Sequence, residues 1–183
     1  MDLSKQRLAL TLAAALLMMA TGLSEARVFS SVGDALQSAF PDCDVERETV
    51  FLTTEQVEKA GKLSGLPAPS ALVHPYVATC SGRPGGTAYF DAHRVRTLPE
   101  TLLVVIDARG AVERVEVLSF DEPEEYIPRS VWYEQFDGER LDDDLELARG
   151  IDGVTGATLT ARATTNAVRR VLAVHMVLEE TAP

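Results

Sequence analysis

The feature that most constrains the fold is a pair of β-forming runs separated by a short turn in the middle of the chain. Residues 101–106 (TLLVVI) form the first run and residues 111–120 (AVERVEVLSF) the second. The four residues between them, DARG, end in Gly110, which suits the left-handed position of a hairpin turn. This pattern predicts an antiparallel hairpin, so we expect the middle of the chain to form an antiparallel sheet.

Other segments extend this sheet and add helices. Further strands are expected at residues 44–52, 70–80 and 87–97, and His74-Pro75 is a candidate interruption of the second one. Helices are expected at residues 31–40, after a cap at 53–56, within 121–144, and from 157 to about 180. Pro75 suggests an edge position for the second of these strands, because proline cannot donate a ladder hydrogen bond. The expected class is α+β, a twisted antiparallel sheet flanked by helices, with the longest helix at the C-terminus.

Residues 1–26 have the features of a secretory signal peptide. A basic start precedes an apolar run at 8–23, and the small residues Ser24 and Ala26 lie at the −3 and −1 positions of a cleavage site after Ala26. The run of 16 residues is short for a spanning helix, which needs roughly 20. The alternative is an uncleaved anchor that tethers the chain to the inner membrane. In both cases residues 27–183 are expected to form a single domain outside the cytoplasm, in the periplasm or another extracytoplasmic location.

Charge and histidine spacing limit the classes of partner. The formal net charge of −11 argues against nucleic-acid binding, which needs a basic footprint. His74, His93 and His175 share no metal-ligand spacing with each other or with the cysteines, so no metal site is expected. The acidic run at 142–144 is interpreted as a solvated loop.

The chain has two cysteines, Cys43 and Cys80. In an oxidising compartment an even number allows a disulfide, but the sequence leaves open whether these two side chains come within bonding range. The chain contains no CxxC and no CxxCH, so it offers no support for a thioredoxin-like site or for covalent c-type haem.

The strongest functional signal is the segment DGVTGAT, residues 152–158, which leads into the C-terminal helix. Its glycines permit a tight turn and a close approach to the backbone. The first turn of a helix carries free N–H groups and a partial positive charge, and it readily binds phosphate. On this pattern alone, Thr155 or Thr158 is more often a plain N-cap. Thr160 is interpreted as an ordinary first-turn residue.

The full string resembles the D-x-x-[ST]-G-A-[ST] attachment sequence of covalently flavinylated FMN-binding domains. That family includes the G subunit of Rnf complexes and the C subunit of the sodium-pumping NADH:quinone oxidoreductase. The resemblance implies that FMN is joined through its phosphate to Thr158 by an FAD:protein FMN transferase, which uses FAD and Mg²⁺ and releases AMP. Asp152, Thr155, Gly156 and Ala157 are implied to form the turn that the transferase recognises and that shapes the phosphate site.

The resemblance covers about residues 40–178. It implies flavin contacts by Glu122 and Tyr126, although the Glu122-Pro123 pair departs from the E-T-P-G-type stretch of the larger subunits. Nearby aromatic residues could flank the flavin ring, but such residues more often fill a core. This second interpretation applies to Trp132, Tyr133 and Phe136. His175, on the apolar face of the last helix, is likewise interpreted as a packed histidine.

These features predict an extracytoplasmic electron carrier with FMN on Thr158. It would relay electrons between envelope redox proteins of the quinone-linked or cytochrome type. A non-covalent flavin would be lost outside the cytoplasm, because occupancy follows the free ligand concentration. Two alternatives stay open. One is a subunit of a flavin-dependent reductase that acts on an external acceptor such as a quinone or ferric iron. The other is a non-redox secreted binding module in which the motif is only a helix cap.

Overall fold

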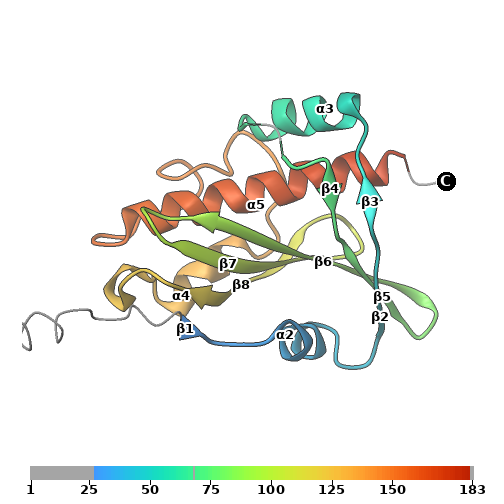
Figure 1. Cartoon of the computed structure of the whole chain (residues 1–183), viewed down its shortest axis with the longest axis horizontal. Helices are drawn as coiled ribbons and strands as arrows, with labels where there is room; N and C mark the ends of the chain where they lie inside the picture. The colour runs from blue at the N-terminus through green and yellow to red at the C-terminus, as the bar shows by residue number, and fades with distance from the viewer. Residues whose placement is uncertain (1–26, 68, 182–183) are drawn as a thin grey trace, which may run out of the picture.

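The computed structural model describes residues 27–67 and 69–181, and a curled, six-stranded antiparallel sheet forms its centre (Figure 1). The strands of this sheet lie in the order β1-β8-β7-β6-β5-β2. Their bounds are β1 Arg27–Val28, β2 Asp44–Arg47, β5 Tyr76–Cys80, β6 Arg83–Arg94, β7 Pro99–Ile106 and β8 Val112–Phe120. A separate two-stranded sheet pairs β3 (Val50–Phe51) with β4 (Leu72–Val73).

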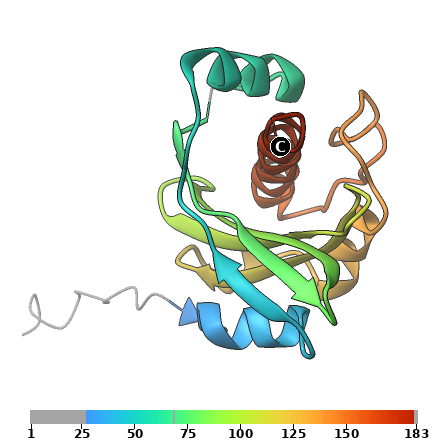
Figure 2. The same cartoon turned by 90° about the vertical axis from the view of Figure 1, so that its right-hand side faces the viewer.

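Helices cover both faces of the main sheet, which confirms the α+β class. The α-helices are α2 Val32–Ala39, α3 Thr54–Ser64, α4 Ser130–Tyr133 and α5 Thr158–Glu179. Two short 3₁₀ helices are η1 Glu124–Tyr126 and η2 Glu134–Phe136. Figure 2 shows α5 lying between the sheet and α3, with α2 on the opposite face. The predicted signal peptide lies outside the described residues, and within them we find no helix long and apolar enough to cross a membrane.

The predicted hairpin is confirmed as β7 and β8. Gly110 in its turn has a φ of 79°. Successive side chains of a strand point to opposite faces, so the two faces of β7 enter different cores. Leu102 and Val104 pack with α5, whereas Leu103 and Val105 pack with α2 on the other face. Because β7 is buried on both faces, its sequence is an almost continuous apolar run.

The predicted C-terminal helix is confirmed as α5, and one side of it fills the larger core. Ala161, Val168 and Leu172 are buried on this side, at separations of seven and four residues that place them on one face of the helix. Each buried Val or Leu side chain contributes roughly 1.5–3 kcal/mol to stability. His175 is 7% exposed, and its Nδ1 lies 3.0 Å from the hydroxyl of Tyr89, so it is the packed histidine that was expected.

Two strand predictions are wrong. The segment 44–52 is not one strand, because β2 and β3 belong to different sheets. Pro75 does not mark an edge, because β5 lies between β2 and β6. Proline is tolerated here because Pro75 lies between β4 and β5, where its carbonyl accepts a hydrogen bond from the N–H of Glu48 at 2.9 Å.

Cys43 and Cys80 form a disulfide. Cys43 directly precedes β2, and Cys80 is the last residue of β5. The two strands pair antiparallel with Asp44 opposite Thr79, so strand pairing brings the two cysteines together. The sequence alone had left this pairing open.

Candidate functional site

The backbone of Asp152, the first residue of the motif, is held by side chains from the short helices α4 and η2. The indole Nε1 of Trp132 donates to the carbonyl oxygen of Asp152 at 2.7 Å. The amide Oε1 of Gln135 accepts from the backbone N–H of Asp152 at 2.9 Å. Trp132 and Phe136 are buried in the main core, as predicted for these aromatic residues. The indole of Trp132 therefore fills the core and fixes the start of the motif.

The turn before α5 requires a glycine at Gly156. This residue has a φ of +87°, in the left-handed region that favours glycine. A Cβ added at Gly156 would meet nothing within 4 Å, so the requirement comes from the backbone and not from lack of space. The turn is closed by a hydrogen bond from the N–H of Ala157 to the carbonyl of Val154 at 3.2 Å.

The N-terminus of α5 has no side-chain cap. Ala157 occupies the N-cap position, and no described side chain accepts a hydrogen bond there. The interpretation of Thr155 or Thr158 as a plain cap is therefore wrong. Instead, Oγ1 of the exposed Thr158 donates to the carbonyl of Val154 at 3.0 Å. The first-turn N–H groups keep their partial positive charge without a neighbouring side-chain acceptor.

A small cavity of about 150 Å³ lies beside this helix start. It is lined by residues 156–160, by Tyr126 of η1 and by Arg96 from the turn between β6 and β7. The guanidinium carbon of Arg96 lies over the ring of Tyr126, 5.0 Å from the ring centroid. The cavity thus combines a hydroxyl group, the N-terminal end of a helix and a fixed cation, which suits a small anionic group.

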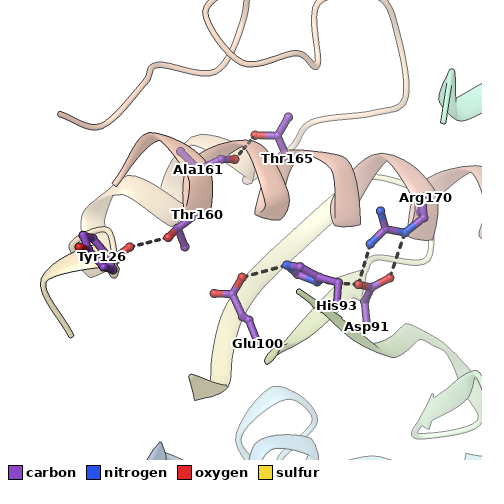
Figure 3. Close-up of polar contacts among 8 residues, drawn as sticks. All are labelled: Asp91, His93, Glu100, Tyr126, Thr160, Ala161, Thr165 and Arg170. Atoms are coloured by element: carbon purple, nitrogen blue, oxygen red, sulfur yellow. Dashed lines mark hydrogen bonds and ion pairs between the residues drawn. The ribbon is translucent and has the colours of Figure 1, made fainter. Parts of the chain in front are cut away.

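Thr160 is not an ordinary first-turn residue. Its side chain is buried and its Oγ1 donates to the carbonyl oxygen of Tyr126 at 2.6 Å (Figure 3). This contact joins the first turn of α5 to η1, 34 residues earlier in the sequence. No local pattern in the sequence signals a contact of this separation.

The other predicted flavin contact, Glu122, binds the backbone of the β6–β7 turn. Its Oε1 accepts from the N–H of Thr97 at 2.7 Å and from the N–H of Leu98 at 2.9 Å. These bonds stabilise the charged form and hold the pKa of Glu122 below its usual range. Glu122 lines a different cavity of about 200 Å³, next to Pro123 and Glu124. The structure therefore brings Tyr126 to Thr158 and places Glu122 behind the turn that carries Arg96.

A buried polar network lies further along α5 (Figure 3). His93 Nδ1 lies 2.8 Å from Asp91 Oδ1, and His93 Nε2 lies 2.9 Å from Glu100 Oε2. Arg170 on α5 donates to Asp91 at 2.9 Å. The second oxygen of Glu100 has no hydrogen-bond partner in the described part of the chain. Sequence reasoning missed this network, because its members come from β6, β7 and α5.

Across residues 27–67 and 69–181, no cluster of three or more histidine, cysteine, aspartate or glutamate side chains has the arrangement of a metal site.

The fold and this site define an α+β domain whose long C-terminal helix begins beside a small cavity suited to a phosphate group. Residues 98–173 match the family model described as the FMN-binding domain. The match begins in the β6–β7 turn, runs through β7, β8 and the motif, and ends within α5. Over these residues the chain is similar to that family, and the match supports the binding of a flavin nucleotide. No curated protein gives a significant match to the chain.

Proposed function

We propose that this protein is an extracytoplasmic electron carrier whose FMN is joined through its phosphate to Oγ1 of Thr158. The observation that carries the proposal is the position of Thr158. Its hydroxyl is exposed at the uncapped start of α5, within a complete attachment motif and inside the segment that matches the FMN-binding domain family.

The residues around Thr158 fit a phosphate group. A cavity of about 150 Å³ is smaller than the roughly 300–1,000 Å³ of pockets that enclose a whole small molecule. It suits the phosphate, whereas the isoalloxazine ring has to lie outside it. A phosphodiester keeps one negative charge, which a helix N-terminus stabilises by about 0.3–1 kcal/mol. Once bound, the flavin ring supplies the electron storage, and the protein supplies position and electrostatics.

The attachment step uses the hydroxyl of Thr158 as the nucleophile. Its Oγ1 forms a bond to the FMN phosphorus of FAD, the bond from that phosphorus to AMP breaks, and the hydroxyl proton is released. Donation to the carbonyl of Val154 directs the hydroxyl proton into the turn, so that the lone pairs of Oγ1 point away from this hydrogen bond. The catalyst is an Mg²⁺-dependent FAD:protein FMN transferase. This enzyme recognises the turn formed by Asp152, Thr155, Gly156 and Ala157.

Two further observations support a place outside the cytoplasm. The disulfide between Cys43 and Cys80 is typical of an oxidising compartment. Residues 1–26 have the composition of a signal peptide or membrane anchor. We infer that the redox partners are envelope proteins of the quinone-linked or cytochrome type. The net charge of −11 favours partners with a basic docking surface.

Co-expression of the chain with a periplasmic FMN transferase tests the proposal. The wild type should give a fluorescent band under ultraviolet light on a denaturing gel and a mass gain of FMN less one water. Thr158→Val should abolish both signals, because it removes the nucleophilic oxygen and keeps the side-chain shape.

Thr155→Val is the matched control, because this threonine is also exposed and lies in the same turn. It should retain at least part of the label. A fluorescent Thr158→Val with an unlabelled Thr155→Val would move the attachment site to Thr155. An unlabelled wild type would refute the covalent carrier. Reduction of the labelled protein by a purified envelope donor, followed by its oxidation by an acceptor, tests the carrier role itself.

A further inference from the structure

Arg96 lies beside the attachment residue without belonging to the motif. Among the described residues that line the cavity at Thr158, only Arg96 carries a positive charge. It precedes the segment that matches the FMN-binding family, which begins at residue 98. It comes from the turn after β6, whereas Thr158 begins α5, so the fold brings together residues 62 positions apart (158 less 96).

Tyr126 fixes the direction of the Arg96 side chain. The guanidinium lies 5.0 Å from the centroid of the Tyr126 ring, in cation–π contact. The backbone of Tyr126 is itself held, because its carbonyl accepts from Thr160 Oγ1 at 2.6 Å and its N–H donates to Pro123 at 2.9 Å. The aromatic ring therefore provides a fixed surface against which the cation rests at the cavity wall.

Glu122 fixes the turn that carries Arg96. Its carboxylate accepts from the N–H groups of Thr97 and Leu98, the two residues that follow Arg96. The turn is closed by a backbone hydrogen bond from Val95 to Leu98 at 3.2 Å. Arg96 thus lies at the tip of a closed turn whose backbone is held from behind.

We propose that Arg96 pairs with the phosphate joined to Thr158, and that Glu122 and Tyr126 serve the flavin site by positioning Arg96. This inference rests on the proposed function. The first group bonded to Oγ1 of Thr158 is the phosphate, and the small cavity that Thr158 and Arg96 share has room for that group but not for the ring. A guanidinium offers two N–H donors to phosphate oxygens, which makes the contact directional.

The flavinylated protein provides one test, through the ³¹P resonance of its phosphodiester and the visible spectrum of its flavin. Arg96→Gln should move the ³¹P resonance and leave the visible spectrum unchanged, and Arg96→Lys should restore part of the shift. Arg83→Gln is the control, because Arg83 is also exposed but lies at the opposite end of β6. It should change neither signal. A change in the visible spectrum without a ³¹P change would place Arg96 at the ring and overturn the proposal.

A matched pair at Tyr126 tests the positioning role. Tyr126→Phe keeps an aromatic face and the backbone carbonyl, so the ³¹P resonance should stay where it is in the wild type. Tyr126→Leu removes the aromatic face and should move the resonance as Arg96→Gln does. Identical ³¹P spectra for these two variants would contradict the role given to Tyr126. Removal of the carboxylate by Glu122→Ala should also move the resonance, because the turn is then no longer held.

A second measurement separates this inference from the proposed attachment. On the unmodified chain, Arg96→Gln should weaken the binding of free FMN about tenfold, because one charge-assisted hydrogen bond is lost. It should leave the binding of riboflavin, which has no phosphate, unchanged. Equal losses for both ligands, or no loss for either, would overturn the pairing with phosphate. If the wild type takes no covalent label but shows this FMN-specific loss, the attachment proposal fails and the role of Arg96 stands.

Discussion

Asp91, His93 and Glu100 lie side by side between the sheet and α5, and their ionisation depends on one another. Burial alone lowers the pKa of His93, but the hydrogen bonds to Asp91 and Glu100 outweigh it and raise the pKa to about 9. Burial raises the pKa of Glu100, whereas the hydrogen bond from His93 and the charge of Arg170 lower the pKa of Asp91 in spite of its own burial. Tyr133 is a further buried ionisable group near Glu100, and its pKa is raised by burial and, to a smaller extent, by the charge of Glu100.

The raised pKa of His93 predicts a loss of stability in mild alkali. The folded protein binds this proton more tightly than the unfolded chain, whose histidine pKa is about 6.5. The stabilisation is therefore complete below pH 6.5 and is lost as the pH rises to about 9. We expect the free energy of unfolding, from urea titrations at several pH values, to fall by up to about 1.4 kcal/mol per pH unit. His93→Gln should flatten this slope, and parallel profiles for the two proteins would contradict the prediction.

A second prediction for single residues compares two glycines of the motif. Gly156→Ala places a Cβ on a residue with a φ of +87° and should destabilise the protein by about 1–2 kcal/mol. A Cβ added at Gly153 meets nothing within 4 Å, and the backbone of this residue is not in the left-handed region. Gly153→Ala should therefore destabilise the protein much less than Gly156→Ala. Denaturant unfolding of the two variants gives the comparison. Equal losses would show that the backbone conformation of Gly156 is not the reason for its presence.

At the scale of elements, α4 and η2 are a support for the motif. These short helices pack between β8 and the loop before α5, and Trp132 and Gln135 hold both backbone groups of Asp152. The motif therefore depends on a segment about 20 residues earlier in the sequence. Without this support, the turn that leads to Thr158 would have only its own hydrogen bonds.

Trp132→Phe isolates this support, because phenylalanine keeps an aromatic ring in the core and removes the N–H donor. We expect a loss of about 0.5–1.5 kcal/mol in stability from the hydrogen bond and a slower initial rate of FMN attachment. Tyr133→Phe is the control on the same helix, since the Tyr133 hydroxyl is buried without a partner among the described residues. It should leave the attachment rate unchanged. Equal attachment rates for Trp132→Phe and the wild type would refute the supporting role.

At the scale of the whole molecule, the sheet separates two hydrophobic cores. The core on one face lies between the sheet and α5, and it includes residues of α4 and η2, which support the site. The other face packs against α2, and Cys43 packs against this second core. The disulfide therefore stabilises the part of the fold that lies away from Thr158.

Removal of the disulfide should lower stability without affecting the site. Loop closure over a separation of 37 residues predicts a loss of about 4 kcal/mol for the double variant Cys43→Ser, Cys80→Ser. Below its melting temperature this variant should accept FMN at the wild-type rate, as shown by in-gel fluorescence. A loss of labelling in the folded variant would mean that the two cores are coupled.

Elements defined by local patterns could be predicted from the sequence, whereas contacts between distant segments could not. The hairpin around Gly110 and the helix α5 follow from turn chemistry and apolar spacing within a few residues. The split between β2 and β3 depends on which strands pair with them, and the residues around Asp44 contain no signal for these pairings. Arg96 was missed for the same reason, because only the folded chain brings the β6–β7 turn to Thr158.

The two ends of the described domain, at Arg27 and after α5, lie at different distances from the cavity at Thr158. Arg27 begins β1 and forms an ion pair with Glu124, two residues before Tyr126 of the cavity at Thr158. The last residue of α5, Glu179, lies far from Thr158, because the 22 residues of this helix span about 33 Å (Figure 1). A linker placed ahead of Arg27 would therefore hold the proposed flavin against whatever carries the linker, whether a membrane or an electrode. A tag or fusion partner after α5 would leave the flavin end open to a second protein.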